Sequence, residues 1–127
     1  MKFSTELPIL VNEVNATCTV NVLELARQKQ SKIVIFPSNA AVYGDLEILP
    51  ITDKTSLYPL SPYAATKIAF EDYMSAFSNS YVIETVILRL CNVYGPRQVY
   101  SEYSGIGSVF INQALRVEKV TVEGDGL

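Results

Sequence analysis

The sequence of 127 residues contains no histidine. Without an imidazole, the chain cannot form a Ser-His-Asp or Cys-His nucleophile system from its own residues, and it cannot form the common zinc sites that use histidine ligands. Acid–base chemistry near neutral pH therefore requires a Tyr, Lys, Cys or carboxylate group with a shifted pKa, or a cofactor. A metal site is not expected.

Positive charge and long apolar runs are also scarce. Ten basic side chains stand against 13 acidic ones, and the basic residues form no cluster, so neither nucleic acid nor a membrane is expected as a partner. The N-terminal ten residues lack the basic and apolar regions of a signal peptide, so the default expectation is a cytoplasmic protein. The two cysteines, Cys18 and Cys91, are expected to be buried free thiols.

Apolar periodicity and turn residues predict alternating helices and strands. Helices are expected over 12–28, 62–77 and 108–116, and strands over 32–36, 81–90 and 119–122. The strands are almost wholly apolar, which is typical of fully buried strands in a parallel sheet covered by helices on both faces. The prediction is therefore an α/β fold.

Two long irregular segments, residues 46–60 and 91–107, interrupt this alternation. In an open α/β sheet, ligands bind at the carboxyl ends of the strands. We therefore expect the site where the first two strands end, next to the helix that Ser61 caps and Pro62 begins.

Tyr63 and Lys67 are the sharpest chemical signal in that helix. Their i,i+4 spacing places both side chains on one helix face, about one turn apart. An ammonium about 4 Å from a phenol stabilises the phenolate by up to about 4 kcal/mol at an effective dielectric near 20. This lowers a tyrosine pKa by as much as about 3 units, which predicts that Tyr63 is a general base. A Tyr-x-x-x-Lys pair taken alone is far more often a plain pair of side chains on an exposed helix surface.

Other motifs accompany this pair in a fixed order. They are Ser4 and Pro8 before the helical segment NATCTVNVLE (15–24), AVYGD (41–45), SPYAATK (61–67), NVYGPRQ (92–98), YSG (103–105) and EGDG (123–126). With these motifs the sequence resembles the NAD-dependent epimerase/dehydratase family, extended short-chain dehydrogenase/reductases that act on nucleotide sugars. The resemblance covers nearly the whole chain.

The resemblance implies roles for five residues. Tyr63 would take a proton from the sugar hydroxyl as a hydride passes to the nicotinamide, and Lys67 would lower the pKa of Tyr63 and bind the nicotinamide ribose. Asn15 would lie near the cofactor, Cys91 beside the nicotinamide, and Asn92 on the diphosphate of the nucleotide sugar. For Asn15 and Asn92, the alternative is a side chain that satisfies backbone groups.

The implied fold is a three-layer Rossmann-like parallel sheet with helices on both faces. The glycine-rich turn that binds the pyrophosphate has no counterpart in the sequence, so the sheet is expected to be incomplete and the chain to be an internal fragment that binds NAD poorly by itself. Residues 1–127 would form the C-terminal half of an NAD(P)-binding domain, running into a substrate-binding region at about 92–127. NAD is favoured over NADP, and the helices over 12–28 and 62–77 are candidates for a homodimer contact.

Two departures from the family pattern bear on the reaction. Asn39 occupies the position of the usual catalytic Ser or Thr; its amide can bind a sugar oxygen but cannot relay a proton as a hydroxyl does. The preceding Ser38 is expected to point to the opposite side of the strand. Ala40 and Ala41 stand where sugar dehydratases carry an acidic residue, which favours epimerisation.

The predicted function is thus part of an NAD-dependent nucleotide-sugar 4-epimerase, with a UDP-sugar as substrate. Two alternatives stay open. One is a non-catalytic relative that binds a nucleotide sugar or NAD; the other is a dehydratase or reductase that uses the same Tyr-Lys pair.

Overall fold

The computed structural model describes residues 2–46, 49–99, 101, 105–120 and 122. The chain divides into two compact units, Met1–Leu90 and Cys91–Leu127. The described elements are α1 (Lys2–Glu6), α2 (Pro8–Asn12), the π-helical turn η1 (Glu13–Thr17), α3 (Cys18–Gln28), β1 (Ile33–Asn39), the 3₁₀ turn η2 (Ala40–Tyr43), α4 (Pro62–Ser80), β2 (Glu84–Leu90) and α5 (Ile106–Leu115).

Strands β1 and β2 pair in parallel, and α4 makes the crossover between them. The register runs from Ile33 opposite Glu84 to Asn39 opposite Leu90, which confirms the predicted parallel sheet. The predicted end of β1 before Pro37 is wrong, because the strand continues for three more residues. A proline is tolerated where a strand has a free edge, since its missing N–H then costs no ladder hydrogen bond.

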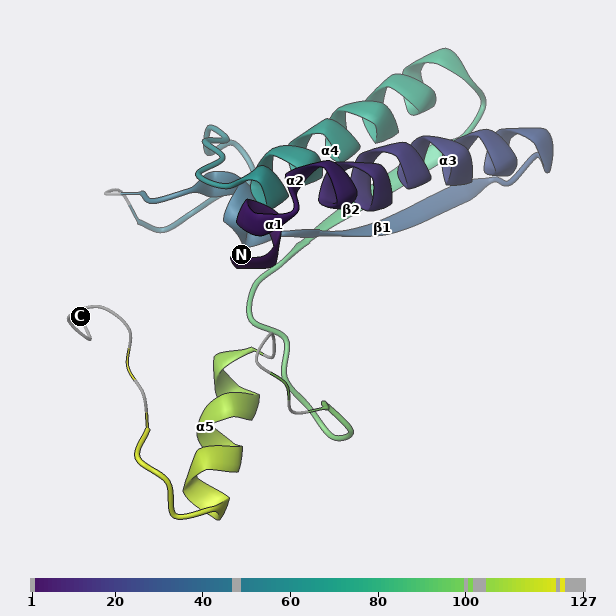
Figure 1. Cartoon of the computed structure of the whole chain (residues 1–127). Helices are drawn as coiled ribbons and strands as arrows, with labels where there is room; N and C mark the ends of the chain where they lie inside the picture. Colours follow the sequence, from purple (N-terminus) through teal and green to yellow (C-terminus); the bar gives the residue numbers. More distant parts are fainter. Residues whose placement is uncertain (1, 47–48, 100, 102–104, 121, 123–127) are drawn as a thin grey trace. The chain divides into compact units, whose positions relative to one another are not determined.

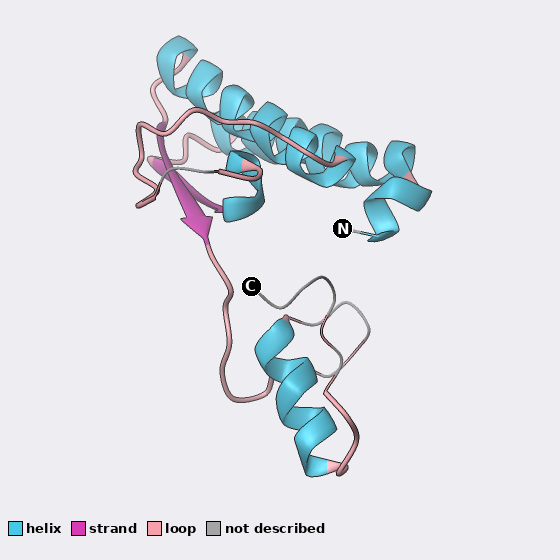
Figure 2. Ribbon diagram, turned by 90° about the vertical axis from the view of Figure 1, so that its left-hand side faces the viewer, coloured by secondary structure: helices cyan, strands magenta, loops and turns pink. Residues whose placement is uncertain are grey.

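Helices α3 and α4 lie side by side along the two strands (Figure 1, Figure 2). Their contact forms the core of the first unit, with Leu23 from α3 and Phe70 and Met74 from α4 almost completely buried. Phe36 of β1 packs against Phe70, with 3.7 Å between the ring centroids. This packing holds the start of α4 at the carboxyl end of β1.

The strands bury one face more than the other, so the prediction of fully buried strands is wrong for these residues. Val34 and Phe36 pack on the core under α3 and α4, whereas Ile33 and Ile35 on the opposite face are 46% and 58% exposed. Period-two alternation follows from the pleat of the strand.

Both cysteines are exposed, so the prediction of buried thiols is also wrong. Cys18 begins α3, which buries Thr19 and Leu23 instead, and Cys91 lies just beyond the last residue of β2. Sequence spacing placed Cys18 on the apolar stripe, but the packed face of the helix lies one residue further along.

The helices are longer than predicted. The expected helix 12–28 starts at Pro8, and α2, η1 and α3 follow one another without a break to Gln28. The cap on α4 is as predicted: the Ser61 hydroxyl accepts a hydrogen bond from the Ala64 N–H at 3.2 Å, and Pro62 is the first helical residue. The helix continues to Ser80, because the polar residues expected to end it form an exposed last turn.

In the second unit, α5 occupies nearly the predicted range. The predicted strand 119–122 is wrong: residues 119, 120 and 122 are not in a strand, and 121 lies outside the described residues. A strand requires a hydrogen-bonded neighbour. Residues 103 and 104 of the YSG motif and all four residues of the EGDG motif (123–126) also lie outside the described residues. None of the described helices is long and apolar enough to cross a membrane.

Candidate active site

The first turns of α4 bring Tyr63 and Lys67 to the carboxyl end of β1. The Lys67 ammonium donates a hydrogen bond to the carbonyl oxygen of Pro37 at 3.2 Å, which ties the helix to the strand. The same ammonium lies 5.7 Å from the centroid of the Tyr63 ring. Asn39, two residues after Pro37, is the last residue of β1. The structure therefore brings the predicted Tyr-Lys pair to the strand end that carries Asn39.

Burial controls the protonation of this pair. It raises the pKa of Tyr63 above its ordinary value of 10.0. It also lowers the pKa of Lys67, an effect that the charge of Glu71 opposes. The expected lowering of the Tyr63 pKa by Lys67 is therefore wrong for this structure. The physical reason is that the ammonium faces the aromatic ring and hydrogen-bonds Pro37, while desolvation disfavours the phenolate.

Asn15 lies in the π-helical turn η1 and holds the start of α4. Its Nδ2 donates to the hydroxyl of Thr66 at 3.0 Å, and that hydroxyl donates to the carbonyl oxygen of Tyr63 at 2.8 Å. The carbonyl of Asn15 accepts a hydrogen bond from the Thr19 hydroxyl. π-Helical turns are frequent at functional sites. The structure thus links Asn15 to the Tyr63 turn through Thr66, which sequence reasoning missed.

Asn39 caps the turn that follows β1. Its Oδ1 accepts a hydrogen bond from the backbone N–H of Ala41 at 2.8 Å. Because a backbone N–H is a donor, this bond fixes the orientation of the amide and leaves the NH₂ group as the part that faces other partners. Ser38 is buried and donates to Glu71 on α4, so the expectation that it points away from Asn39 is confirmed.

Gly44 of the AVYGD motif lets the long loop pass close to η2. The residue has φ +70°, and a Cβ added to it would lie 2.1 Å from the carbonyl oxygen of Tyr58. The Tyr58 N–H donates to the Val42 carbonyl at 2.9 Å. Only glycine fits this combination of backbone angle and close approach.

Glu71, which is buried, and Arg89, which is partly buried, form an ion pair that sequence reasoning also missed. Arg89 Nη2 lies 2.7 Å from Glu71 Oε2, joining β2 to α4. The signal was present in the sequence: Arg89 is the one charged residue in the run TVILRL (85–90), and a charge in a strand that packs against a helix needs a partner.

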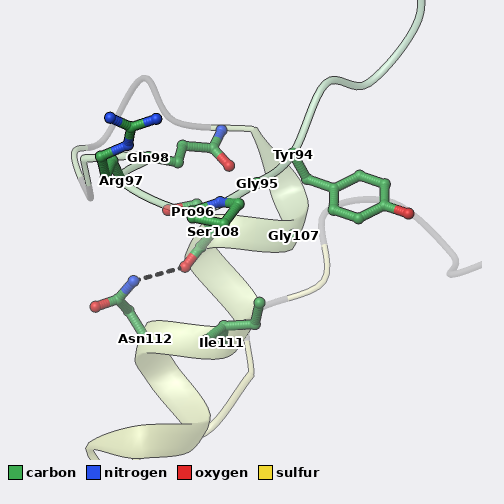
Figure 3. Close-up of a pocket in the computed structure, with 9 residues that line it drawn as sticks. All are labelled: Tyr94, Gly95, Pro96, Arg97, Gln98, Gly107, Ser108, Ile111 and Asn112. Carbon is green, nitrogen blue, oxygen red and sulfur yellow. Dashed lines mark hydrogen bonds between the residues drawn. The ribbon is translucent and has the colours of Figure 1, made fainter.

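The second unit contains Cys91 and Asn92, both exposed, and a pocket of about 330 Å³ (Figure 3). The roles predicted for these two residues stay predictions. The described lining residues are Tyr94, Gly95, Pro96, Arg97, Gln98, Gly107, Ser108, Ile111 and Asn112. Arg97 carries the one charge among them, and Asn112 Nδ2 donates to the Ser108 carbonyl at 2.9 Å.

The sequence profile of the NAD-dependent epimerase/dehydratase family matches residues 2–127. The chain belongs to this family. The chain is similar to UDP-glucose 4-epimerase from Mycolicibacterium smegmatis, to which it is 33% identical over 127 residues, 99% of this chain and 41% of the relative. The chain thus spans about two fifths of the length of such relatives.

Two solved structures of epimerases share the fold of this family member. One is a UDP-N-acetylglucosamine 4-epimerase from Methanobrevibacter ruminantium in complex with UDP-N-acetylmuramic acid, with a TM-score of 0.92 and 35% identity. The match covers 98% of this chain and 41% of the epimerase chain. The other is a Thermus thermophilus UDP-glucose 4-epimerase in complex with NAD, with a TM-score of 0.87 and 39% identity. This match covers 94% of this chain and 39% of the epimerase chain. The predicted Rossmann-like α/β class is confirmed.

Proposed function

We propose that the complete product of this gene is an NAD-dependent UDP-sugar 4-epimerase and that this chain supplies its proton-transfer residues. The observation that carries the proposal is the position of Tyr63 and Lys67 together at the carboxyl end of β1. It is supported by the similarity of nearly the whole chain to 4-epimerases.

The side chains at the strand end suit the nicotinamide ribose of NAD. The Lys67 ammonium has three N–H donors and uses one of them in its hydrogen bond to the Pro37 carbonyl oxygen. No described residue forms a hydrogen bond with the Tyr63 hydroxyl. The ammonium and the phenol can therefore both donate hydrogen bonds to the ribose hydroxyl oxygens. Bound there, NAD would supply the hydride acceptor and donor.

Tyr63 would move the proton in this reaction. Its hydroxyl oxygen, once ionised, accepts the proton of a sugar hydroxyl and later returns it. Burial opposes that ionisation, so the Lys67 ammonium has to approach the phenolate more closely than its present bond to Pro37 allows. Asn39 would donate from its NH₂ group to a sugar oxygen.

Residues in η2 favour epimerisation over dehydration. Ala40 and Ala41 follow Asn39 there and carry no carboxylate that would promote elimination. The second candidate is a non-catalytic relative that binds nucleotide sugars. It is favoured by Asn39, because the Oδ1 of this residue is occupied by the Ala41 N–H and relays no proton.

The test is conversion of UDP-glucose to UDP-galactose by the complete gene product with NAD, followed by NMR. We expect turnover in the wild type and a loss of about 10²–10⁴-fold in kcat for Tyr63→Phe. Tyr81→Phe, at an exposed tyrosine beyond the far end of the same helix, is the matched control and should keep full activity. Binding of UDP-glucose without turnover would support the non-catalytic relative instead.

We also propose a homodimer through α3 and α4. A groove of about 350 Å³ lies between these helices, and its described lining includes Val20, Ala69 and Tyr73, the last 43% exposed. Its other lining residues, Asn12, Ala16, Thr17 and Asn21, make the groove partly polar, and its apolar members are of the kind found at contacts between subunits.

A further inference from the structure

The proposed function leaves unused a partly buried ion pair next to the site. Glu71 on α4 is only 4% exposed, and Arg89 on β2 donates to both of its carboxylate oxygens, at 3.1 Å from Nε and 2.7 Å from Nη2. Glu71 in turn raises the pKa of Arg89. A buried ion pair contributes little net stability compared with apolar residues of the same volume. Its position is therefore more informative than its strength.

Two further hydrogen bonds extend this pair to the strand end. The Ser38 hydroxyl donates to Glu71 Oε1, and Arg89 Nη1 donates to the Tyr43 hydroxyl at 2.9 Å. Ser38 belongs to β1, and Tyr43 ends η2. One carboxylate and one guanidinium thus join β1, η2, α4 and β2 at a single point.

That point adjoins two residues of the proposed site, Asn39 and Lys67. Ser38 immediately precedes Asn39, and Glu71 lies one helical turn after Lys67. Lys67 is held to the same strand by its bond to Pro37. A shift of Glu71 would therefore move both the end of β1 and the turn of α4 that carries Lys67.

The network also sets the charge around Lys67. The titratable groups in its surroundings are Tyr63 and Glu71 on α4 and, through Glu71, Tyr43 on η2 and Arg89 on β2. Of these, Glu71 raises the pKa of Lys67 against the effect of burial.

We propose that Glu71 is a positioning residue for the epimerisation: held by Arg89, it fixes the end of β1 and η2 against α4 and thereby places Asn39 and Lys67. This rests on the function proposed above. Glu71 touches neither substrate nor cofactor in this account and acts through its neighbours.

The experiment compares kcat, KM and the pH profile of Glu71→Gln, Glu71→Asp and wild type in the complete gene product. We expect Glu71→Gln to lower kcat by about 10–100-fold with KM nearly unchanged, since a misplacement of about 1 Å costs about 10²-fold. The alkaline limb of the pH profile of Glu71→Gln should move to lower pH. The reason is that Lys67 loses the negative charge of Glu71, which favours the protonated ammonium. Glu71→Asp keeps the charge, so the limb should stay in place and part of kcat should return.

The matched control is Glu24→Gln, which breaks an exposed Glu–Arg pair on α3 and should leave kcat and the pH profile unchanged. If Glu71→Gln does not fold, Ser38→Ala takes its place: it releases β1 but keeps the ion pair, so kcat should fall with the limb unmoved. A folded Glu71→Gln with wild-type kcat and pH profile overturns the proposal.

A wild type without epimerase activity would contradict the proposed function, and the effect of Glu71 on Lys67 is then tested without turnover. In that case the inference is tested by NMR: the side chain of Lys67 is labelled with ¹³C at Cε, and its chemical shift is followed as a function of pH. The titration midpoint of Lys67 should be lower in Glu71→Gln than in wild type, and an equal midpoint overturns the inference.

Discussion

Tyr63 is subject to two opposing influences. Burial disfavours its phenolate, and the Lys67 ammonium, which favours a phenolate, lies over the ring rather than at the hydroxyl. The balance in this structure is decided by desolvation, because the phenolate loses hydration without gaining a direct partner. The proton transfer proposed above therefore requires a rearrangement of the Lys67 side chain as the site fills.

The first prediction concerns that balance. Phenolate absorbance is titrated in the wild type and in Tyr63→Phe, without NAD or substrate. The difference between the two curves separates Tyr63 from the seven other tyrosines of this chain. The midpoint should lie above pH 10.0, since burial raises the pKa of Tyr63. A Tyr63 midpoint below pH 10.0 would show that Lys67 outweighs burial.

The second prediction concerns Asn39. Replacing it by Ser keeps a side-chain oxygen that can cap η2 and adds a hydroxyl that can relay a proton. We expect kcat to rise by about 10-fold, part of the 10²–10⁴-fold range of acid–base catalysis. Steady-state kinetics with UDP-glucose measure it. Asn39→Ala, which lacks both cap and relay, is the control and should lower kcat; an equal or lower kcat in Asn39→Ser would mean that the amide is adapted to its substrate.

Sequence reasoning identified the residues of the pair but not their electrostatics. The i,i+4 spacing placed Tyr63 and Lys67 on one helix face, because helix geometry is local. The pKa of Tyr63 depends on burial by segments far away in the sequence, and the side chain of Lys67 turns toward Pro37, 30 residues earlier. Neither effect leaves a signal in the local pattern.

At the scale of elements, α4 connects the core to the site. Its start carries Tyr63 and Lys67, and its middle buries Phe70 and Met74 against α3 and the strands. The helix was predictable from its cap and proline. The ion pair that crosses from it to Arg89 required the fold, because only strand pairing brings β2 beneath Glu71.

The third prediction tests this connection. Phe70→Ala removes a ring that is 1% exposed and packs on Phe36, so the free energy of unfolding should fall by about 3–5 kcal/mol. Urea denaturation measures the change. Phe3→Ala, on an exposed side chain of α1, is the control and should change the free energy much less. A loss below about 1 kcal/mol for Phe70→Ala would contradict the assigned core.

At the scale of the whole molecule, the alternation of apolar strands and helices predicted the parallel sheet, and the family resemblance implied the Rossmann-like class. The burial of each strand face did not follow from composition. Ile33 and Ile35 are as apolar as Val34 and Phe36, yet only the latter pair packs under the helices. The apolar run in β1 could not distinguish the two faces, because a strand buried on both faces and one buried on a single face can share the same residues.

The fourth prediction concerns assembly. If α3 and α4 form the homodimer contact, Tyr73→Glu places a charge in the groove between them and should convert dimers to monomers. Sedimentation velocity of the complete gene product measures the change. Tyr94→Glu, on an exposed residue outside both helices, should leave the dimer intact. A wild type that sediments as a monomer contradicts the proposed dimer.

The most direct test of the account follows the hydrogen at C4 of the sugar. The complete gene product with NAD is given UDP-glucose deuterated at C4, and the UDP-galactose formed is examined by mass spectrometry and NMR. Removal and return of a hydride, with Tyr63 handling only the hydroxyl proton, predicts that the product keeps its deuterium at C4 and that Tyr63→Phe forms almost none. UDP-galactose that has exchanged its deuterium for solvent hydrogen, or equal turnover by Tyr63→Phe, would contradict the account.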